Sequence, residues 1–599
     1  MKELEYPFDG AWIMKKRRKI KNMLLEDGST RIEKRIAVLG GSTTSDIMSA
    51  MELFLLNSGI KPLFYESEYA RYWQDAMFDN PELEEFKPDI VFIHTSSRNL
   101  DFFPESVTCT SHEMEDALTA QYDHFEQMWN RISEVYHCPI IQNNFEMPSY
   151  RLLGNSDAWD VHGKINFITR LNCKFYEYAQ KHPSFYINDI NYVSACYGLD
   201  EWLEPKYWYL YKYAMCVPAI PYFAYNTVRI IKSVFGKNKK VLALDLDNTL
   251  WGGVIGDDGQ EGIEIGHETT MGQGYEEVQH YIKAHKQLGI LLTVCSKNDE
   301  ENALLGLNHP SSILKPDDFT VIKANWCPKD MNITETADDL NLLPESFVFV
   351  DDNPAERAIV EGQIPGIAVP VFETVEDCIS SIDKAGYFEI TALSSDDSKR
   401  GEMYKANAER AKLQKSFGSY EEYLKSLDMS AKITDFEPIY LQRIVQLTNK
   451  SNQFNLTTRR YQLDEMNKIA ENSSYIRLCG SLSDQFGDNG IVSIVIAETV
   501  GQTAHIDLWL MSCRVLKRDM ELAMLDELVR QCVDRSVTKI IGHYYKTNKN
   551  AMVADLYGSF GFVKVQEFDN GDSTWELKTA NYKNKNYVIK VNEQEITVK

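Results

Sequence analysis

The stretch "VLALDLDNTLWGGVIGDDG", residues 241–259, carries Asp245 and Asp247 two positions apart, directly after an apolar run. A carboxylate can attack phosphorus and form an aspartyl-phosphate, and a second carboxylate two residues on can exchange a proton with the leaving group. An anionic nucleophile approaches a phosphate when Mg²⁺, held by oxygen ligands, offsets the repulsion. The motif indicates magnesium-dependent phosphoryl transfer; two aspartates that only cap a helix are the alternative.

Further polar residues follow other apolar runs in the same part of the chain. Ser296 ends "LGILLTVCS", Asp351 and Asp352 follow "SFVFV", and Lys329 stands just before a predicted helix. Open α/β folds gather such residues at the carboxyl edge of a parallel sheet, where ligands bind. There Ser296 can bind a phosphoryl oxygen and Lys329 can compensate charge. Asp351 or Asp352 can complete the metal site.

The elements that must position these residues alternate between apolar strands and helices. Strands are predicted at residues 36–39, 90–94 and 139–142, and the alternation resumes after residue 240. Later come the apolar strands "GIVSIVIAE" and "AHIDLWLMS" and a helix that starts near Lys517. We therefore predict an α/β protein with domains at 1–235, 236–392 and 431–580, a helical connector at 393–430 and a polar tail at 581–599.

Composition and charge exclude several classes. With 63 Lys and Arg against 88 Asp and Glu, the net charge of −25 argues against a large nucleic-acid surface. The basic run "KKRRKIK", residues 15–21, either docks an acidic partner or forms a solvated helix face. No run of about eighteen apolar residues occurs, so we expect a cytoplasmic protein without membrane contact. The 11 cysteines form no CxxC pair, which argues against a zinc ribbon or a disulfide framework.

The quoted motifs resemble those of haloacid-dehalogenase-superfamily (HAD) phosphotransferases: DLDNT the first, VCS the second, the Lys of WCPKDMNI the third and VFVDD the fourth. The extension LWGGVIGDDG, together with LTNKSNQFNLTTRRY and MSCRVL, resembles the FkbH-like branch over about residues 36–580. The resemblance implies that Asp245 is the nucleophile and Asp247 the acid–base. We predict Mg²⁺ as the cofactor. Its expected ligands are Asp245, Asp247, Asp351 and Asp352, and the expected phosphate-binding residues are Thr249, Ser296 and Asn298.

The FkbH-like resemblance also implies a reaction. Members transfer a glyceryl group from 1,3-bisphosphoglycerate, with loss of phosphate, to the phosphopantetheine thiol of an acyl carrier protein. An acyl group awaiting a thiol is well held as a thioester, and Cys295 is the best-placed cysteine. Adjacent strand residues point to opposite faces, so Cys295 packing in the core is the alternative. A phosphatase acting on a small metabolite, with flanking domains that bind partners, is the alternative function.

The first domain resembles an SGNH-hydrolase fold, a doubly wound sheet with Ser42 in the position of the nucleophile. No Asp-x-x-His follows in "YGLDEWLEPKYW", so Ser42 as a helix cap in a degenerate scaffold or docking domain is the alternative. The middle domain is expected to be a HAD-like Rossmannoid parallel sheet.

The third domain resembles a GNAT-type acyltransferase, a mixed α/β sheet. Arg514 aligns with the start of its pyrophosphate loop, but Lys517 and Asp519 stand where glycines belong, which argues against free coenzyme A. Lys517 and Arg518 are instead candidates for the phosphate of a carrier's arm. Tyr557 is either an acid or a packing residue.

Overall fold

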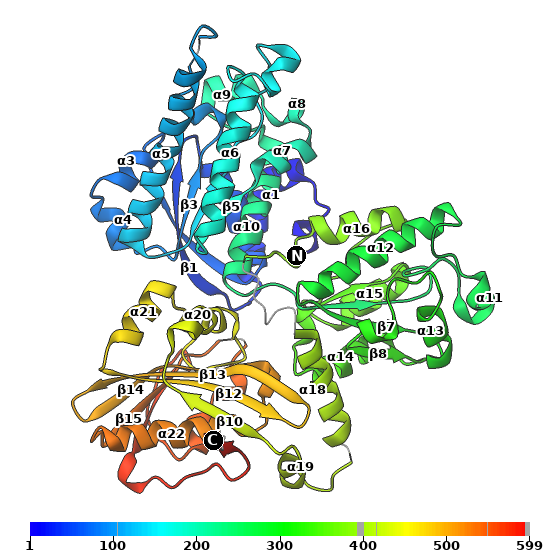
Figure 1. Ribbon diagram of the computed structural model, residues 1–599, viewed down its shortest axis with the longest axis vertical. Coiled ribbons are helices and arrows are strands. Elements are labelled where there is room, and N and C mark those ends of the chain that lie inside the picture. Colours follow the sequence, from blue (N-terminus) through cyan, green and yellow to red (C-terminus); the bar gives the residue numbers. More distant parts are fainter. Residues whose placement is uncertain (105, 392–399, 415, 548, 593–599) are drawn as a thin grey trace, which may run out of the picture. The chain divides into compact units, whose positions relative to one another are not determined.

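The computed structural model describes residues 1–104, 106–391, 400–414, 416–547 and 549–592 (Figure 1). The chain divides into two compact units. The first is Met1–Lys237 with a short segment that begins at Glu389, and the second holds Asn238–Phe388 and the described residues from 400 onward. Residues 393–399 of the predicted connector and 593–599 of the predicted tail lie outside the described residues.

The first unit is built on a parallel sheet with the strand order β2-β1-β3-β4-β5. Ile36 and Val38 of β1 face one hydrophobic core, and Ala37 and Leu39 face another, as the two-residue period of a strand requires. Helices α1, α2 and α10 pack in the first core and α5 and α6 in the second, so the predicted doubly wound sheet is confirmed. The bounds are β1 Ile32–Gly40, β2 Ile60–Glu66, β3 Ile90–His94, β4 Ile140–Asn143, β5 Phe185–Asn188, α1 Gly10–Glu26, α2 Ser45–Asn57, α5 Ser111–Tyr136, α6 Lys164–Lys181 and α10 Ile220–Val234.

The basic run of residues 15–21 lies within α1. Arg17 is 3.4 Å from Asp46 and Lys21 is 2.7 Å from Glu52, and both carboxylates belong to α2. Ile20 of the same run is buried in the core. The run therefore forms the polar face of a packed helix, which favours the helix-face interpretation.

The second unit begins with a parallel sheet of strand order β8-β7-β6-β9. This arrangement confirms the predicted Rossmannoid sheet. Strands β6, β7 and β9 are buried and the edge strand β8 is mostly half-buried, and each strand ends at a polar loop that leads into a helix. The bounds are β6 Val241–Leu244, β7 Leu291–Ser296, β8 Val321–Ala324, β9 Phe347–Val350, α11 Ile255–Gly262, α12 Thr270–Gln287, α13 Glu300–Leu307, α14 Lys329–Asp339, α15 Pro354–Gln363 and α16 Val375–Lys384.

A mixed sheet completes the second unit. Its order is β16-β17-β15-β14-β13-β12-β10-β18, with β11 paired to β14. The pairs β14–β15 and β10–β18 are parallel, and the other pairs are antiparallel. The predicted mixed α/β sheet is confirmed. The bounds are β10 Ser430–Thr434, β11 Phe454–Asn455, β12 Tyr475–Asp484, β13 Gly487–Val500, β14 Thr503–Met511, β15 Lys539–Tyr544, β16 Val563–Glu567, β17 Ser573–Lys578 and β18 Lys590–Val591.

Helices cover both faces of the mixed sheet. Residues of α20, Leu441–Lys450, and α21, Leu463–Glu471, pack in one core, and α22, Met520–Asp534, packs in the other. Two further helices, α18, Arg400–Gln414, and α19, Tyr420–Ser426, precede the sheet. Among the described residues, no helix combines the length and the apolar character that a membrane crossing needs.

Two sequence-based expectations in this region need correction. Helix α22 begins at Met520 rather than near Lys517, because Lys517 and Asp519 have φ angles of 63° and 60°, outside the right-handed helical region. The predicted polar tail is in part structural, since β18 pairs with β10 at the edge of the sheet and Ile589 is buried.

Candidate active site at the edge of the second sheet

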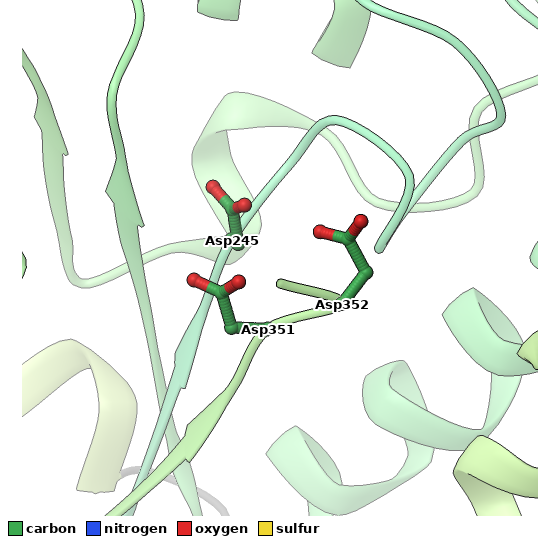
Figure 2. A group of neighbouring side chains, drawn as sticks. All are labelled: Asp245, Asp351 and Asp352. Carbon is green, nitrogen blue, oxygen red and sulfur yellow. The ribbon is translucent and has the colours of Figure 1, made fainter. Parts of the chain in front are cut away.

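Three carboxylates meet where β6 and β9 end. The two strands are neighbours with Leu244 opposite Val350, and the N–H of Asp245 donates to the carbonyl of Val350 at 2.9 Å. Asp245 and Asp351 therefore leave the sheet side by side, and Asp352 turns toward them (Figure 2). One carboxylate oxygen from each of the three lies within 4.8 Å of the others. The edge of the sheet thus concentrates negative charge at one point.

Lys329, the first residue of α14, neutralises part of this charge. Its Nζ lies 2.9 Å from Oδ2 of Asp245 and 2.5 Å from Oδ2 of Asp351, and its side chain is 4% exposed. Burial opposes the charged form of Lys329, but the two carboxylates outweigh burial and raise its pKa. Among the described residues, Lys329 is the cation that forms ion pairs with this cluster, so one ammonium group faces three carboxylates and the site has an excess of negative charge.

The donor set fits a hard divalent cation. Burial and the nearby Asp245 carboxylate raise the pKa of Asp351 and of Asp352. The ionised carboxylates therefore lack enough nearby positive charge to stabilise them. Within the part of the chain that the structure describes, Oδ1 of Asp245 is buried without a hydrogen-bond partner. A buried oxygen that lacks a donor is costly unless a cation or a ligand satisfies it. Carboxylate oxygens are the ligands that Mg²⁺ prefers.

Asp247 is held apart from the three-carboxylate group. Its Oδ1 accepts from the indole N–H of Trp251 at 2.9 Å and from the N–H of Ile255 at 3.0 Å, and its Oδ2 accepts from Asn298 at 3.0 Å. Its side chain is not among the clustered carboxylates, so the geometry brings together three of the four predicted metal ligands. Burial raises the pKa of Asp247, which favours the protonated form that a general acid needs.

The three predicted phosphate-binding residues surround the same edge. Thr249 Oγ1 accepts from the N–H of Asp352 at 3.1 Å, and this bond orients the loop after β9. Asn298 orients Asp247, as described above. Ser296 ends β7 with 2% exposure, and its carbonyl accepts from the N–H of Asn325 at 3.1 Å. All three are buried side chains at the carboxyl ends of strands β6 and β7 or in the loops that follow.

Cys295 lies in the hydrophobic core beneath this edge. It is 2% exposed and packs with Ile333 and Ala337 of α14, and its Sγ is 3.5 Å from the carbonyl oxygen of Lys329. Burial raises the pKa of its thiol, which keeps the sulfur protonated and a poor nucleophile. This placement favours the packing alternative for Cys295.

Sequence reasoning missed two residues that support the site. Trp251 is fully buried and donates to Asp247, and its ring fills the space beside Gly306, where an added Cβ would come within 2.6 Å of it. Arg357 donates to the carbonyls of Asp351 and Asp352 at 2.7 and 3.0 Å. Trp251 in "DNTLWGG" and Arg357 in "NPAER" could not be identified from the sequence as site residues. Neither side chain has a catalytic or metal-binding role there, and each only orients its neighbours.

In the first unit, Ser42 does not cap a helix. Thr44 is the N-cap of α2, so the helix-cap alternative is wrong. Ser42 is 2% exposed, and its Oγ lies 2.7 Å from Nε2 of His94. His94 comes from the end of β3 rather than from a late Asp-x-x-His, which is why a search for that motif missed it.

The candidate arm-binding residues of the mixed sheet point inward. Arg514 and Arg518 are 5% exposed, and Arg518 lies 3.0 Å from Asp484 and 2.5 Å from Oδ1 of Asn407 in α18. Burial and repulsion from Arg410 lower the pKa of Arg518 to about 10. Lys517 alone is exposed. The structure therefore does not display Lys517 and Arg518 as a pair.

Tyr557 is inaccessible to solvent, and the space beside it, where β14 and β15 stop pairing, is filled. Tyr557 is fully buried, its ring packs on Gly542, and burial raises the pKa of its hydroxyl. Strands β14 and β15 pair only as far as Ile506 and Gly542. Beyond that point, Leu456 donates to the carbonyl of Trp509 at 3.0 Å and accepts from the N–H of Tyr545 at 2.9 Å. The chain's own β11 segment thus fills the space between the two strands.

Comparisons with known proteins agree with this organisation. Residues 35–232 match the model of the FkbH N-terminal domain. The N-terminal part of the protein BF1531 from Bacteroides fragilis, which contains a phosphatase domain and was crystallised with Mg, is 28% identical. That match has a TM-score of 0.58 and covers 63% of this chain and 99% of that one.

The ribosomal-protein-S18-alanine N-acetyltransferase of Escherichia coli is 14% identical, with a TM-score of 0.21, and covers 26% of this chain and 99% of that one. No curated protein matches the chain significantly. Residues 35–232 are thus similar to the FkbH N-terminal domain, and 63% of the chain is similar to a Bacteroides protein that contains a phosphatase domain.

Proposed function

We propose that the second unit is a Mg²⁺-dependent enzyme that takes a small acyl phosphate such as 1,3-bisphosphoglycerate and delivers a glyceryl-type acyl group to the phosphopantetheine thiol of an acyl carrier protein. The observation that carries the phosphate part is the cluster of Asp245, Asp351 and Asp352, in which Lys329 pairs with the two buried carboxylates, Asp245 and Asp351. The acyl-transfer part is supported by the FkbH family match and by the extended motif after Asp247.

Asp245, Asp351 and Asp352 would hold the magnesium ion, and the related Bacteroides protein was crystallised with Mg. When bound, Mg²⁺ supplies positive charge that lets an anionic carboxylate approach a phosphate. Lys329 adds a fixed cation in contact with Asp245 and Asp351. Asn298 and Trp251 keep the Asp247 carboxyl in one orientation, so that it can give its proton to a leaving oxygen.

Two different bonds break when 1,3-bisphosphoglycerate becomes a glyceryl thioester. At the acyl phosphate, the thiolate sulfur attacks the carbonyl carbon, the C–O bond breaks and inorganic phosphate leaves with its electron pair. At the phosphate ester, Asp245 attacks phosphorus, the P–O bond to the sugar-acid oxygen breaks and Asp247 protonates that oxygen. Water then hydrolyses the aspartyl-phosphate. Asp245 and Asp247 are suited to breaking the P–O bond of the phosphate ester, and the thiol is suited to breaking the C–O bond of the acyl phosphate.

The alternative is a phosphatase on a small phosphorylated metabolite, with the flanking domains as binding modules. The buried Arg518 favours this alternative, because Arg518 was one of the two residues expected to meet the phosphate of a carrier's arm. Water accepts the phosphoryl group in both; the proposal adds a thiol that accepts the acyl group.

Intact-mass analysis distinguishes the two. The protein is incubated with Mg²⁺, 1,3-bisphosphoglycerate and a holo carrier protein, and the carrier is then weighed. We expect a glyceryl mass increase on the holo carrier and none on the apo carrier, which lacks the thiol. Asp245→Asn should abolish the product, whereas Asp257→Asn, in the exposed part of the same motif, should not. Free glycerate at the same rate with and without carrier would establish the phosphatase instead.

A further inference from the structure

A chain of buried polar side chains crosses the carboxyl edge of the first sheet. It runs from Asn226 in α10 through Asn188 at the end of β5 and Asn143 at the end of β4 to His94 and Ser42. Asn188, Asn143 and His94 are fully buried, and Ser42 is 2% exposed. In such surroundings each donor needs one acceptor, so the direction of every hydrogen bond is determined by its neighbours.

The amide of Asn143 has only one consistent orientation. Its Nδ2 lies 3.1 Å from the carbonyl oxygen of Thr95, which can only accept, so this atom must be the NH₂ group. Its Oδ1 accepts from Nδ2 of Asn188 at 2.8 Å, and Oδ1 of Asn188 accepts from Nδ2 of Asn226 at 2.8 Å. The donors therefore all point toward His94.

This orientation determines which nitrogen of His94 carries the hydrogen. Nδ2 of Asn143 lies 2.8 Å from Nδ1 of His94, so Nδ1 must accept. Burial lowers the pKa of His94 to about 3, so the ring is neutral and has a single N–H. That N–H is on Nε2 and donates to Oγ of Ser42, 2.7 Å away. Ser42 therefore accepts a hydrogen bond from the very atom that would have to take its proton.

We propose that Asn143 is a positioning residue that holds His94 in the Nε2–H tautomer and thereby keeps Ser42 from acting as a nucleophile. A serine becomes nucleophilic when the histidine nitrogen that faces it is a bare acceptor, and an aspartate at the other ring nitrogen ensures that state. In serine proteases, exchanging that aspartate for its amide lowers kcat about 10⁴-fold through the wrong tautomer. Here the amide is the native residue. The first unit thus has the serine and the histidine of a hydrolase in a state that cannot transfer an acyl group.

The tautomer can be read directly in the wild-type protein. With ¹⁵N-labelled histidine, the two ring nitrogens have different shifts, and His94 is assigned by its loss in His94→Gln. We expect a bare Nδ1 and a protonated Nε2 that do not change between neutral pH and about two units below it. A protonated Nδ1 in the wild type would overturn the proposal, whatever any variant does.

Asn143→Asp provides a second test, because it replaces the hydrogen-bond donor that faces Nδ1 of His94 by an acceptor without changing the shape of the side chain. We expect His94 to switch to the Nδ1–H tautomer and Ser42 to react with a small fluorophosphonate at least about tenfold faster than in the wild type. The label should be absent from Asn143→Asp combined with Ser42→Ala. Labelling of Ser42 in the wild type as fast as in Asn143→Asp would contradict the proposal. So would a folded Asn143→Asp variant whose tautomer switches without any gain in labelling.

Discussion

Lys329→Met tests the electrostatics of the candidate site most directly. The side chain of Lys329 is 4% exposed and lies 2.9 and 2.5 Å from two carboxylates that are 10% and 0% exposed. Removing one member of such a buried arrangement leaves uncompensated charge and costs about 3–5 kcal/mol. Methionine keeps much of the apolar stem, so the loss reports charge more than packing. We expect the free energy of unfolding of the metal-free second unit to fall by that amount.

Magnesium should restore much of the loss, because three carboxylates without a lysine gain more from a bound cation than three with one. A ligand at 100 times its Kd stabilises the folded state by about 2.7 kcal/mol. The measurement is urea unfolding followed by circular dichroism, in EDTA and at saturating MgCl₂. The difference between wild type and variant should be large in EDTA and should shrink with magnesium. Release of phosphate, measured with MgCl₂, should be slower in the variant than in the wild type.

Lys323→Met is the matched control. Lys323 lies in β8 of the same sheet, and its Nζ is 3.1 Å from Glu335, whose side chain is 51% exposed, and 3.7 Å from Asp339, whose side chain is 20% exposed. Pairs of this kind contribute less than about 1 kcal/mol, and magnesium has no reason to change that value. If Lys329→Met cost no more than Lys323→Met in EDTA, or if its loss were independent of magnesium, the electrostatic account of the site would be refuted.

Three further changes test other parts of the structure. Cys295→Ser should leave phosphate release and carrier loading nearly unchanged. It should lower the free energy of unfolding by about 0.5–3 kcal/mol, because Cys295 packs in the core. Loss of carrier loading in a folded variant would instead support the thioester hypothesis. Trp251→Phe removes a hydrogen bond that lowers the pKa of Asp247, so this pKa should rise. The basic limb of the pH–rate profile for phosphate release should then move to higher pH. A basic limb at the wild-type pH would exclude Asp247 as the general acid. Glu521→Gln tests the mixed sheet: burial raises the pKa of Glu521 to about 7, so the stability contributed by its neutral form is lost as pH rises from about 4.5 toward 7. Thermal and urea unfolding should show Gln stabilising near pH 8 relative to pH 5 by about 2–3 kcal/mol, and no pH-dependent difference would contradict the assigned burial.

Much of the site was predictable because a short-range pattern encodes it. An apolar strand followed at once by a polar residue predicts a side chain at the carboxyl edge of a parallel sheet, and Asp245, Ser296 and Asp351 obey that rule. The alternation of strand residues also predicted that Cys295 could face the core beside Ser296. Each of these predictions depends only on the period of a strand and on the residue that ends it.

Other features had no local signal. His94 meets Ser42 because β3 lies beside β1 in the sheet, and Asn143 and Asn188 join them from the next two strands. Arg518 turns inward because Asp484 and Asn407, which are distant in sequence, offer it acceptors. A charged residue in a loop is normally read as exposed, and only the positions of its acceptors reverse that expectation.

The sequence by itself determined the α/β architecture, the motif order and the residues that gather at the edge of the second sheet, because hydrophobic periodicity and strand ends act over a few residues. The tertiary structure alone decided which carboxylates cluster, which arginines are buried and which nitrogen of His94 carries a hydrogen. Those outcomes depend on distances between strands and on the direction of hydrogen bonds in a dry interior. There a single carbonyl, that of Thr95, orients an amide and, through it, a histidine.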